Sequence, residues 1–269
     1  MWHSVPQHLT HFHDPHSQGT PTYIARSVAA GSFLRGTSAR SFPPMPELRG
    51  KAKELYIEAH GQSVYDSYSD TAGTSHGGHL RRLDQPPGLF LHRPDHDIES
   101  VFWTLLSSVL RVYPSDGPLE TNTSPRFQAA IKNLDSHVID CTEDDSRLTF
   151  TSWEEEDFHA ALHPRLTTLA PMLQQMALQI QPEYAYLLPS PRMEHLHEAM
   201  RRLLLQQIVD MGDDVIPLDP KKERVPTVDG KPINQSRGTK RMYGTPEVLE
   251  MVELSHRSKR SKGEIKRVF

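Results

Sequence analysis

The stretch His92-Arg-Pro-Asp-His-Asp-Ile-Glu-Ser-Val-Phe-Trp-Thr-Leu-Leu-Ser-Ser-Val-Leu-Arg111 decides the fold of this chain. Its apolar side chains cover most of a helical circumference: Ile98, Val101, Phe102, Trp103, Leu105, Leu106, Val109 and Leu110. A helix that is apolar nearly all round belongs at the centre of a domain. We therefore predict a buried core helix, with Asp97 as its N-terminal cap, Glu99 in its first turn and an end near Tyr113. The apolar run is shorter than the roughly 18 residues of a membrane span.

Further helices are predicted downstream from caps and apolar spacing. Ser124-Pro125 predicts a helix start, with the proline at the first helical position, and Phe127 and Leu134 follow at helical spacing. Ser152 and Glu155 form a capping-box pattern for the next helix. Leucines at helical intervals then predict a helix over 166–180, kinked at its proline 171. The last predicted helix opens at Ser190-Pro191 and ends at Gly212, and we place Glu194 and His195 on its surface.

Composition points to an intracellular protein with long polar segments. Apolar residues make up 36% of the 269 residues, and 22 prolines with 15 glycines predict much loop or disorder. The single cysteine, Cys141, excludes an intramolecular disulfide framework and fits a reducing compartment. Because the N-terminus lacks the basic and apolar regions of a signal peptide, we expect a cytoplasmic or nuclear location without membrane association.

Charge is distributed unevenly along the chain. Residues 221–269 carry 13 Lys and Arg against 6 Asp and Glu, whereas residues 1–220 carry 17 basic and 28 acidic residues. A basic tail on an acidic body is typical of an arm that binds an importin, nucleic acid or another acidic partner. The alternative is a solvated tail that only keeps the protein soluble.

The N-terminal segment contains five histidines: His3, His8, His11, His13 and His16. The spacing of the last three, with Asp14 between them, could place imidazoles around zinc or copper. Structural zinc sites need well-held ligands, and nothing in this segment fixes them. We interpret these residues as surface histidines and predict no metal ligands in the chain.

Two motifs resemble those of protein kinases, most closely the fungal-type kinase family and its casein-kinase-like relatives. Asp97-Ile-Glu-Ser100 before the apolar helix is similar to the start of the central helix of the kinase C-lobe. Gly19-Thr-Pro-Thr-Tyr-Ile-Ala-Arg-Ser27 is similar to the Gly-Thr-x-x-Phe-Met-Ala-x-Glu pattern that ends the activation segment. The resemblance covers residues 17–210 and is sharpest at 19–27 and 95–111. The motif positions are Gly19, Thr20, Ala25, Ser27, Asp97 and Glu99.

The resemblance implies roles for several of these positions. Thr20 would contact the catalytic loop of a complete kinase, and Asp97 would hold the backbone of that loop. The glutamate that closes the family's first motif pairs with a distant arginine. This chain has Ser27 at that position, so we expect the buried ion pair to be absent or replaced by a weaker contact.

The resemblance also implies a missing catalytic set. Kinase chemistry needs a Gly-rich loop, a strand lysine, a His-Arg-Asp-x-x-x-x-Asn loop and an Asp-Phe-Gly magnesium ligand. In a kinase all of these precede the Gly-Thr motif, and the 18 residues before Gly19 contain none of them. ATP and magnesium are therefore implied for the full family domain only. We expect no catalytic or cofactor-binding residue here.

Together these observations predict a mainly α fold, a partial kinase C-lobe with a long disordered insertion and disordered termini. Residues 1–36 would form an activation-segment-like N-terminus, 37–88 a low-complexity insertion, 89–212 the helical core and 213–269 a basic disordered tail. Within the insertion, Glu47 to His60 is compatible with an exposed charged helix, and residues 61–88 are predicted to be disordered.

Three functions are compatible with the sequence. The chain is a fragment of a Ser/Thr kinase that is inactive as it stands, a non-catalytic pseudokinase-like interaction module, or a truncated gene product without a selected role. Each large apolar side chain left uncovered on the central helix would forfeit about 1.5–3 kcal/mol of burial. We therefore expect an isolated chain that is marginally stable, oligomeric or dependent on protein partners that cover its exposed core.

Overall fold

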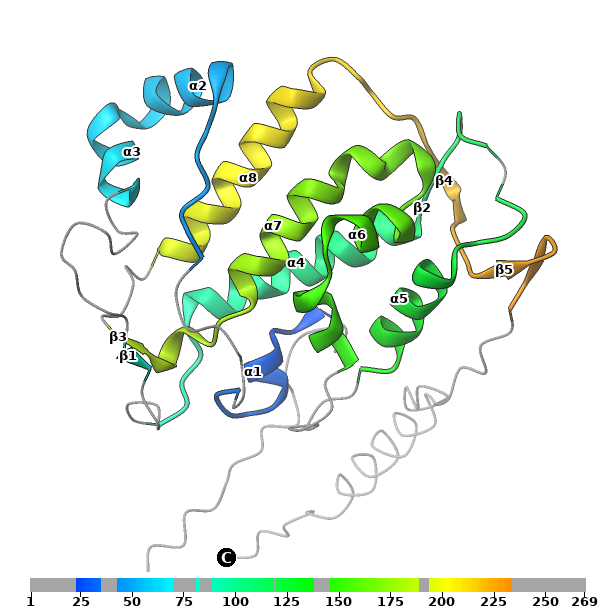
Figure 1. Ribbon diagram of the computed structural model, residues 1–269, viewed down its shortest axis with the longest axis horizontal. Coiled ribbons are helices and arrows are strands. Elements are labelled where there is room, and N and C mark those ends of the chain that lie inside the picture. The colour runs from blue at the N-terminus through cyan, green and yellow to red at the C-terminus, as the bar shows by residue number, and fades with distance from the viewer. Residues whose placement is uncertain are drawn as a thin grey trace, which may run out of the picture. The chain divides into compact units, whose positions relative to one another are not determined.

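A computed structural model describes residues 23–34, 43–69, 81–82, 89–118, 120–137, 146–188 and 194–233, and most of their secondary structure is helical (Figure 1). The α-helices in these ranges are α1 (Arg26–Ala29), α2 (Gly50–His60), α3 (Gln62–Ser69), α4 (Pro94–Arg111), α5 (Pro125–Asp135), α6 (Glu155–Ala161), α7 (Ala170–Ile180) and α8 (His195–Met211). The short 3-10 helices are η2 (Ser146–Ser152), η3 (Pro164–Leu169) and η4 (Tyr184–Tyr186). The chain divides into two compact units, 1–232 and 233–269, and all of these elements belong to the first.

The strands of the described ranges form three antiparallel pairs. They are β1 (Arg81–Arg82) with β3 (Leu187–Leu188), β2 (Val112–Pro114) with β4 (Leu218–Glu223), and β5 (Thr227–Val228) with β6 (Lys231–Pro232). In the second pair Val112 lies opposite Glu223 and Pro114 opposite Leu218. Residues 213–232 are therefore folded, and the prediction of a disordered tail from residue 213 is wrong for this part. The basic cluster 256–267 lies outside the described residues.

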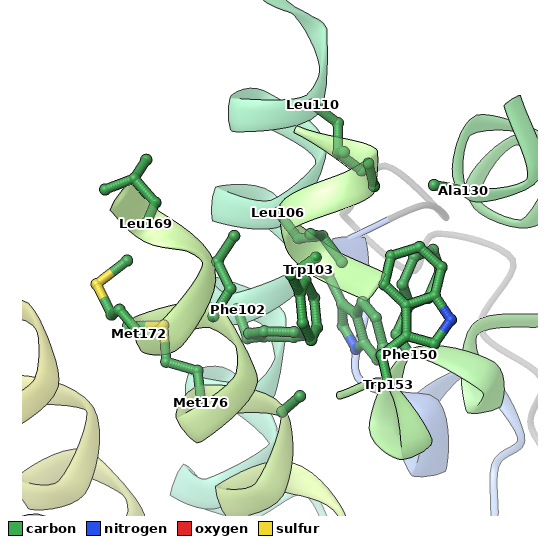
Figure 2. Packing of buried hydrophobic residues seen from close by; sticks show 14 of the residues in the cluster. Phe102, Trp103, Leu106, Leu110, Ala130, Phe150, Trp153, Leu169, Met172 and Met176 are labelled. Carbon is green, nitrogen blue, oxygen red and sulfur yellow. The ribbon is translucent and has the colours of Figure 1, made fainter. Parts of the chain in front are cut away.

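Helix α4 packs against α1, α5, α7 and α8 and carries the centre of the hydrophobic core. Phe102, Trp103, Leu106 and Leu110 on its inner face are fully or almost fully buried. Figure 2 shows these side chains between α7, which contributes Met172 and Met176, and the aromatic residues Phe150 and Trp153. Burying a side chain of this size stabilises the fold by about 1.5–3 kcal/mol. The predicted core helix is confirmed on this face.

The opposite face of α4 is exposed, which corrects the prediction of a helix buried all round. Asp97, Val101, Thr104 and Ser108 recur at helical spacing, and all four are exposed. Three of these are polar, so the helix is amphipathic, with an apolar arc wider than usual. We call these four residues the outer face of α4.

The start of α4 also differs from the prediction. The helix begins at Pro94 and not after Asp97, because the extended Arg93 precedes it and the Arg93 N–H donates to His96 Nδ1 at 3.1 Å. A side chain at the third helical position that accepts from the capping residue's N–H satisfies a free helix donor. Proline suits the first turn because its missing N–H would be unpaired there anyway.

The other caps give mixed outcomes. Helix α5 starts at Pro125 as predicted, and Ser124 caps it, since its Oγ accepts from Phe127 N at 3.0 Å. The capping box at Ser152 is wrong: that residue ends η2, and α6 starts after Glu154, whose N–H donates to Asp157. Pro171 sits in the first turn of α7 and does not kink it.

Helix α8 ends as predicted but is more buried at its start. Gly212 follows it with φ +55°, a left-handed conformation that suits glycine. His195, expected on the surface, is buried, whereas Glu194 is exposed. The predicted opening at Ser190-Pro191 lies outside the described residues.

Residues 43–69 are folded, contrary to the predicted low-complexity insertion. The expected helix after Glu47 exists as α2, but Tyr56 on it is buried, so it is not a free surface helix. Helix α3 lies where we expected disorder, and it buries Tyr65 against α2. Arg202 of α8 donates to the carbonyls of Pro46 and Tyr65 and so fastens this region to the core.

Candidate functional site

The two segments that carry the kinase resemblance meet at the first half of α4. Ala25 N donates to Ser100 Oγ at 3.0 Å, and Arg26 N donates to Glu99 Oε1 at 3.0 Å. These residues are 75 and 73 positions apart in the sequence. We define the α1–α4 junction as Arg26, Asp95, His96, Glu99 and Glu183, the charged and titratable side chains that surround this contact.

A buried ion pair holds the junction together. Arg26 Nε lies 2.6 Å from Glu99 Oε1, and the two side chains are 1% and 9% exposed. Trp103 Nε1 donates to the same carboxylate oxygen at 2.9 Å. Burial alone would raise the pKa of Glu99, but the Arg26 charge and these hydrogen bonds bring that pKa below its ordinary value. Glu99 is therefore ionised at neutral pH.

Two further contacts fix the segment before α1. Arg26 also donates to the carbonyl of Ile180 at the end of α7. The fully buried Arg147 donates to the carbonyl of Ile24 at 2.7 Å, and its guanidinium lies 5.0 Å from the Trp103 ring centroid. Both guanidinium groups thus saturate backbone carbonyls that would be costly to bury unpaired.

The motif positions differ in burial and in the contacts that they make. Ser27 is buried, and the buried ion pair is formed by the residue before it, with the cation on the α1 segment and the acid on α4. This pair differs from the one that the family's glutamate would make, so the expected absence or weakening of that pair at Ser27 stays a prediction. The Asp97 side chain is 66% exposed and lies 3.2 Å from His92. It holds no other loop within the described ranges. Gly19 and Thr20, like the N-terminal histidines, lie outside those ranges.

A small cavity of about 10 Å³ lies beside the ion pair and is lined by all five junction residues. One imidazole nitrogen of His96 and one carboxylate oxygen each of Asp95 and Glu183 lie within 4.8 Å of one another, and all three residues are buried. Glu183 accepts from Leu34 N at 3.3 Å. Burial, together with the charges of Glu99 and Asp95, raises the pKa of Glu183.

Two side-chain nitrogens of the junction are buried without a hydrogen-bond partner, Arg26 Nη1 and His96 Nε2. His96 Nδ1 accepts the capping bond from Arg93, while its Nε2 is buried and has no hydrogen-bond partner. Burial lowers the pKa of His96, so the imidazole is neutral near pH 7. In a neutral imidazole one nitrogen donates and the other accepts.

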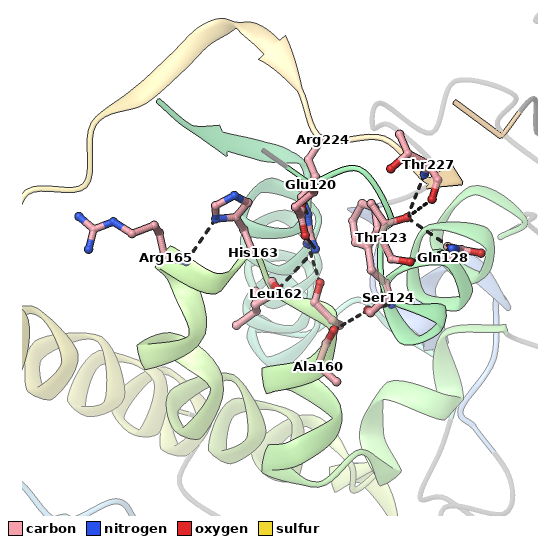
Figure 3. A network of polar contacts seen from close by, with 12 residues as sticks. Glu120, Thr123, Ser124, Gln128, Ala160, Leu162, His163, Arg165, Arg224 and Thr227 are labelled. Carbon is pink, nitrogen blue, oxygen red and sulfur yellow. Dashed lines mark hydrogen bonds and ion pairs between the residues drawn. The ribbon is translucent and has the colours of Figure 1, made fainter. Parts of the chain in front are cut away.

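A second polar network lies around Arg224, which follows β4 (Figure 3). Arg224 binds both carboxylate oxygens of Glu120, at 2.5 and 2.8 Å, and donates to the carbonyl of Ala161 at 2.6 Å. Its guanidinium lies 3.8 Å from the Phe127 ring centroid. Here one buried cation meets one carboxylate, so the charges balance. We call Arg224 and Glu120 the Arg224 junction; it borders an open cavity of about 350 Å³.

Sequence reasoning missed four of the five junction residues. Arg26 lies inside the first motif, but at a position where the family pattern specifies no residue type. Asp95 and His96 are adjacent in the first turn of α4, but the predicted helix is capped at Asp97 and so begins after them. Glu183 lies in a short segment after α7, and nothing in its local sequence marks it.

The comparisons with known proteins leave the family open. No family model matches this chain, and searches of curated proteins and of solved structures find no match. Within the described ranges no helix has both the length and the apolar character required to cross a bilayer.

Proposed function

We propose that this chain is a non-catalytic interaction module built like the C-terminal part of a fungal-type kinase C-lobe. One observation carries the proposal: the two segments that resemble kinase motifs pack against each other through the buried pair Arg26–Glu99 and the Ala25–Ser100 bond. Activation-segment end and central helix would meet in the same way in a kinase-like fold. An accidental likeness of two short motifs would give no reason for them to touch.

The same 269 residues argue against phosphoryl transfer by this chain. They contain no His-Arg-Asp and no Asp-Phe-Gly sequence. Phosphoryl transfer depends almost entirely on positioning and on charge stabilisation by such groups. Asp97, the residue that would hold the catalytic loop, points to solvent.

The outer face of α4 supports binding to protein. Val101 is 48% exposed, and Ile98, Leu105 and Val109 beside it are only partly buried. Each apolar side chain that a partner covers fully would contribute about 1.5–3 kcal/mol. This face has one acidic residue and no Lys or Arg, so it favours a protein over a nucleic acid. The basic tail as a binding site for an importin or nucleic acid stays a prediction.

Nucleotide binding tests the non-catalytic part of the proposal. We expect Mg-ATP to leave the Tm of the purified chain unchanged up to millimolar concentration, with MgCl2 alone as the control. A ligand at 100 times its Kd stabilises the folded state by about 2.7 kcal/mol, which a thermal shift detects easily. A Tm rise with Mg-ATP but not with MgCl2 would contradict the proposal.

Concentration dependence tests the binding part. We expect the Tm of the purified chain to rise with protein concentration, because copies cover each other's outer faces when no other partner is present. Val101→Asp should abolish that rise, whereas Glu156→Gln, an exposed change on α6, should not. A cooperative transition of a monomer with a constant Tm would show that the outer face needs no cover.

A further inference from the structure

We propose that the cavity of the α1–α4 junction binds a divalent metal cation through Asp95, His96 and Glu183. The three side chains come from two parts of the chain: the first turn of α4, and the segment that follows α7. They are only 8%, 3% and 6% exposed, so no surface loop or crowd of solvated acids is involved. This inference is independent of the proposed interaction function.

The size of the site fits a single ion. The candidate ligand atoms of Asp95, His96 and Glu183 lie within 4.8 Å of one another. Oxygen and nitrogen ligands bind zinc at roughly 2.0–2.2 Å, so two ligands of one ion lie at most about 4.4 Å apart. If the ligand atoms move toward one another by a few tenths of an ångström, all three can coordinate the same ion. The cavity of about 10 Å³ holds little more than one water-sized particle.

The charge balance of the junction favours a cation. Three carboxylates, Asp95, Glu99 and Glu183, line the cavity, and Arg26 is the only Lys or Arg among the described residues that line it. Glu99 already neutralises Arg26 at 2.6 Å. Arg93 reaches Asp95 Oδ1 at 3.1 Å from the half-exposed side. Glu183 accepts hydrogen bonds from the N–H groups of Leu34 and Ala185. A bound cation would add positive charge to a cavity whose described lining contains three buried carboxylates.

His96 is the independent observation that points to a ligand. Its Nε2 is buried and makes no hydrogen bond, although the ring is part of the cavity wall. The Arg93 bond to Nδ1 places the imidazole proton on Nε2 in the metal-free state. Ligation through Nε2 needs its lone pair, so that proton must move to Nδ1 through solvent and the Arg93 bond must open. Any proton on Glu183 leaves to solvent at the same time.

The donor set indicates which ions would bind. Two carboxylates and one imidazole suit manganese, iron(II) and zinc, with water completing the coordination. The five N-terminal histidines could also take up zinc, so Mn²⁺, which prefers oxygen ligands, is the better first probe. Its free ion gives an EPR signal that disappears on binding.

The experiment is a titration of the EDTA-treated full chain with MnCl2, followed by EPR and repeated with ZnCl2 by calorimetry. We expect one Mn²⁺ per chain and a higher Tm in its presence. Glu183→Gln and His96→Gln should each weaken Mn²⁺ binding by roughly tenfold or more, since even residues behind the ligands change affinity by 10–100-fold. Melting curves in EDTA verify that both variants fold.

His163→Gln is the matched control. His163 is also buried with an unpartnered Nε2, but it lies beside the Arg224 junction and belongs to no cluster of candidate ligands among the described residues. Its variant should bind Mn²⁺ as the parent does. The proposal is overturned if Mn²⁺ does not bind and zinc binding is unchanged in Glu183→Gln. It is also overturned if the control loses affinity as much as the two junction variants. Water, and not a metal, would then fill the cavity.

Discussion

The α1–α4 junction and the Arg224 junction use the same device with different chemistry. In both, an arginine with a side chain at most 2% exposed binds a glutamate far away in the sequence, Glu99 or Glu120, and also donates to backbone carbonyls. Each fastens a peripheral segment, residues 23–34 or 218–232, to the helical core. Around Arg26, however, two more buried acids, Asp95 and Glu183, and a histidine with an unpartnered Nε2 line the same cavity, whereas Arg224 meets one carboxylate.

This difference distinguishes buried charges that only hold the fold together from buried charges that could bind a ligand. A buried arginine that saturates a carboxylate and several carbonyls explains why a segment stays docked, and needs no ligand to do so. Additional acids in the same low-dielectric space oppose folding unless a proton or a cation compensates them. The α1–α4 junction is therefore the place to look for binding, and the Arg224 junction is its natural control.

Replacing Glu99 or Glu120 should lower the free energy of unfolding more than the other changes below. The two losses show which junction contributes more to stability. Glu99→Ala leaves Arg26 buried without its partner, so we expect a loss of about 3–5 kcal/mol in the free energy of unfolding. Glu120→Ala should cost about 1–3 kcal/mol, because Glu120 is partly exposed and Arg224 keeps its carbonyl acceptors. Urea denaturation measures both.

Glu99→Gln serves as the milder companion if the alanine variant does not fold. It keeps the shape of the side chain and removes only the charge, so its loss should be intermediate. Equal losses at Glu99 and Glu120 would show that the two junctions contribute alike and would remove the basis of the comparison.

The pH dependence of the α1–α4 junction should come next in size. The folded-state pKa of Glu99 lies below its ordinary value of 4.5, so the unfolded chain binds more protons as the pH falls. The stability that Glu99 contributes is fully present above pH 4.5 and is lost as the pH falls through the lowered pKa. The difference between the parent and Glu99→Gln should therefore be constant at neutral pH and shrink below pH 4.5. A difference that grows on acidification would contradict the ion pair.

Local signals in the sequence predicted much of the helical core. Three local signals each span one or two helical turns, and the structure confirms them: the apolar spacing around Phe102 and Leu106, the helix start at Ser124-Pro125, and the helix end at Gly212. Helix α3 was missed because its fold depends on Tyr65 packing against α2 and on Arg202 of a distant helix. Contacts with residues far away in the sequence cannot be predicted from the composition of the segment itself.

The candidate site was less predictable for the same reason. Arg26 and Glu99 are 73 residues apart, and Glu183 bonds to the backbone of a residue 149 positions away. Spacing rules describe neighbours on one helix or strand and cannot pair such residues. The resemblance to kinases drew attention to Glu99 as a motif position, but its pattern specifies no residue type at position 26 and so gave no signal for the arginine there. The family relationship itself stays a prediction.

Substitutions of Ser100 and Ser124 compare the two regions with a smaller expected loss of stability. Ser100→Ala removes the acceptor of Ala25 N, and leaving that N–H unpaired should cost about 1–3 kcal/mol. Ser124→Ala removes the cap of α5 and should cost about 0.5–2 kcal/mol. Hydrogen exchange distinguishes them, because the first should expose residues 23–34 and the second only the first turn of α5. Exchange spreading from Ser124 to residues 23–34 would mean that the junctions are coupled.

The smallest effect is expected at Asp97, two residues before Glu99 on the same helix. Its side chain is 66% exposed and, within the described ranges, lies near only the exposed His92, so Asp97→Asn should change the free energy of unfolding by less than about 0.5 kcal/mol. The two motif acids would then contribute differently: Glu99 stabilises the fold, and Asp97 has no structural role in the described ranges. A loss of several kcal/mol would mean instead that Asp97 holds a segment outside those ranges, as a kinase would require, and that the outer face of α4 is covered by the chain itself.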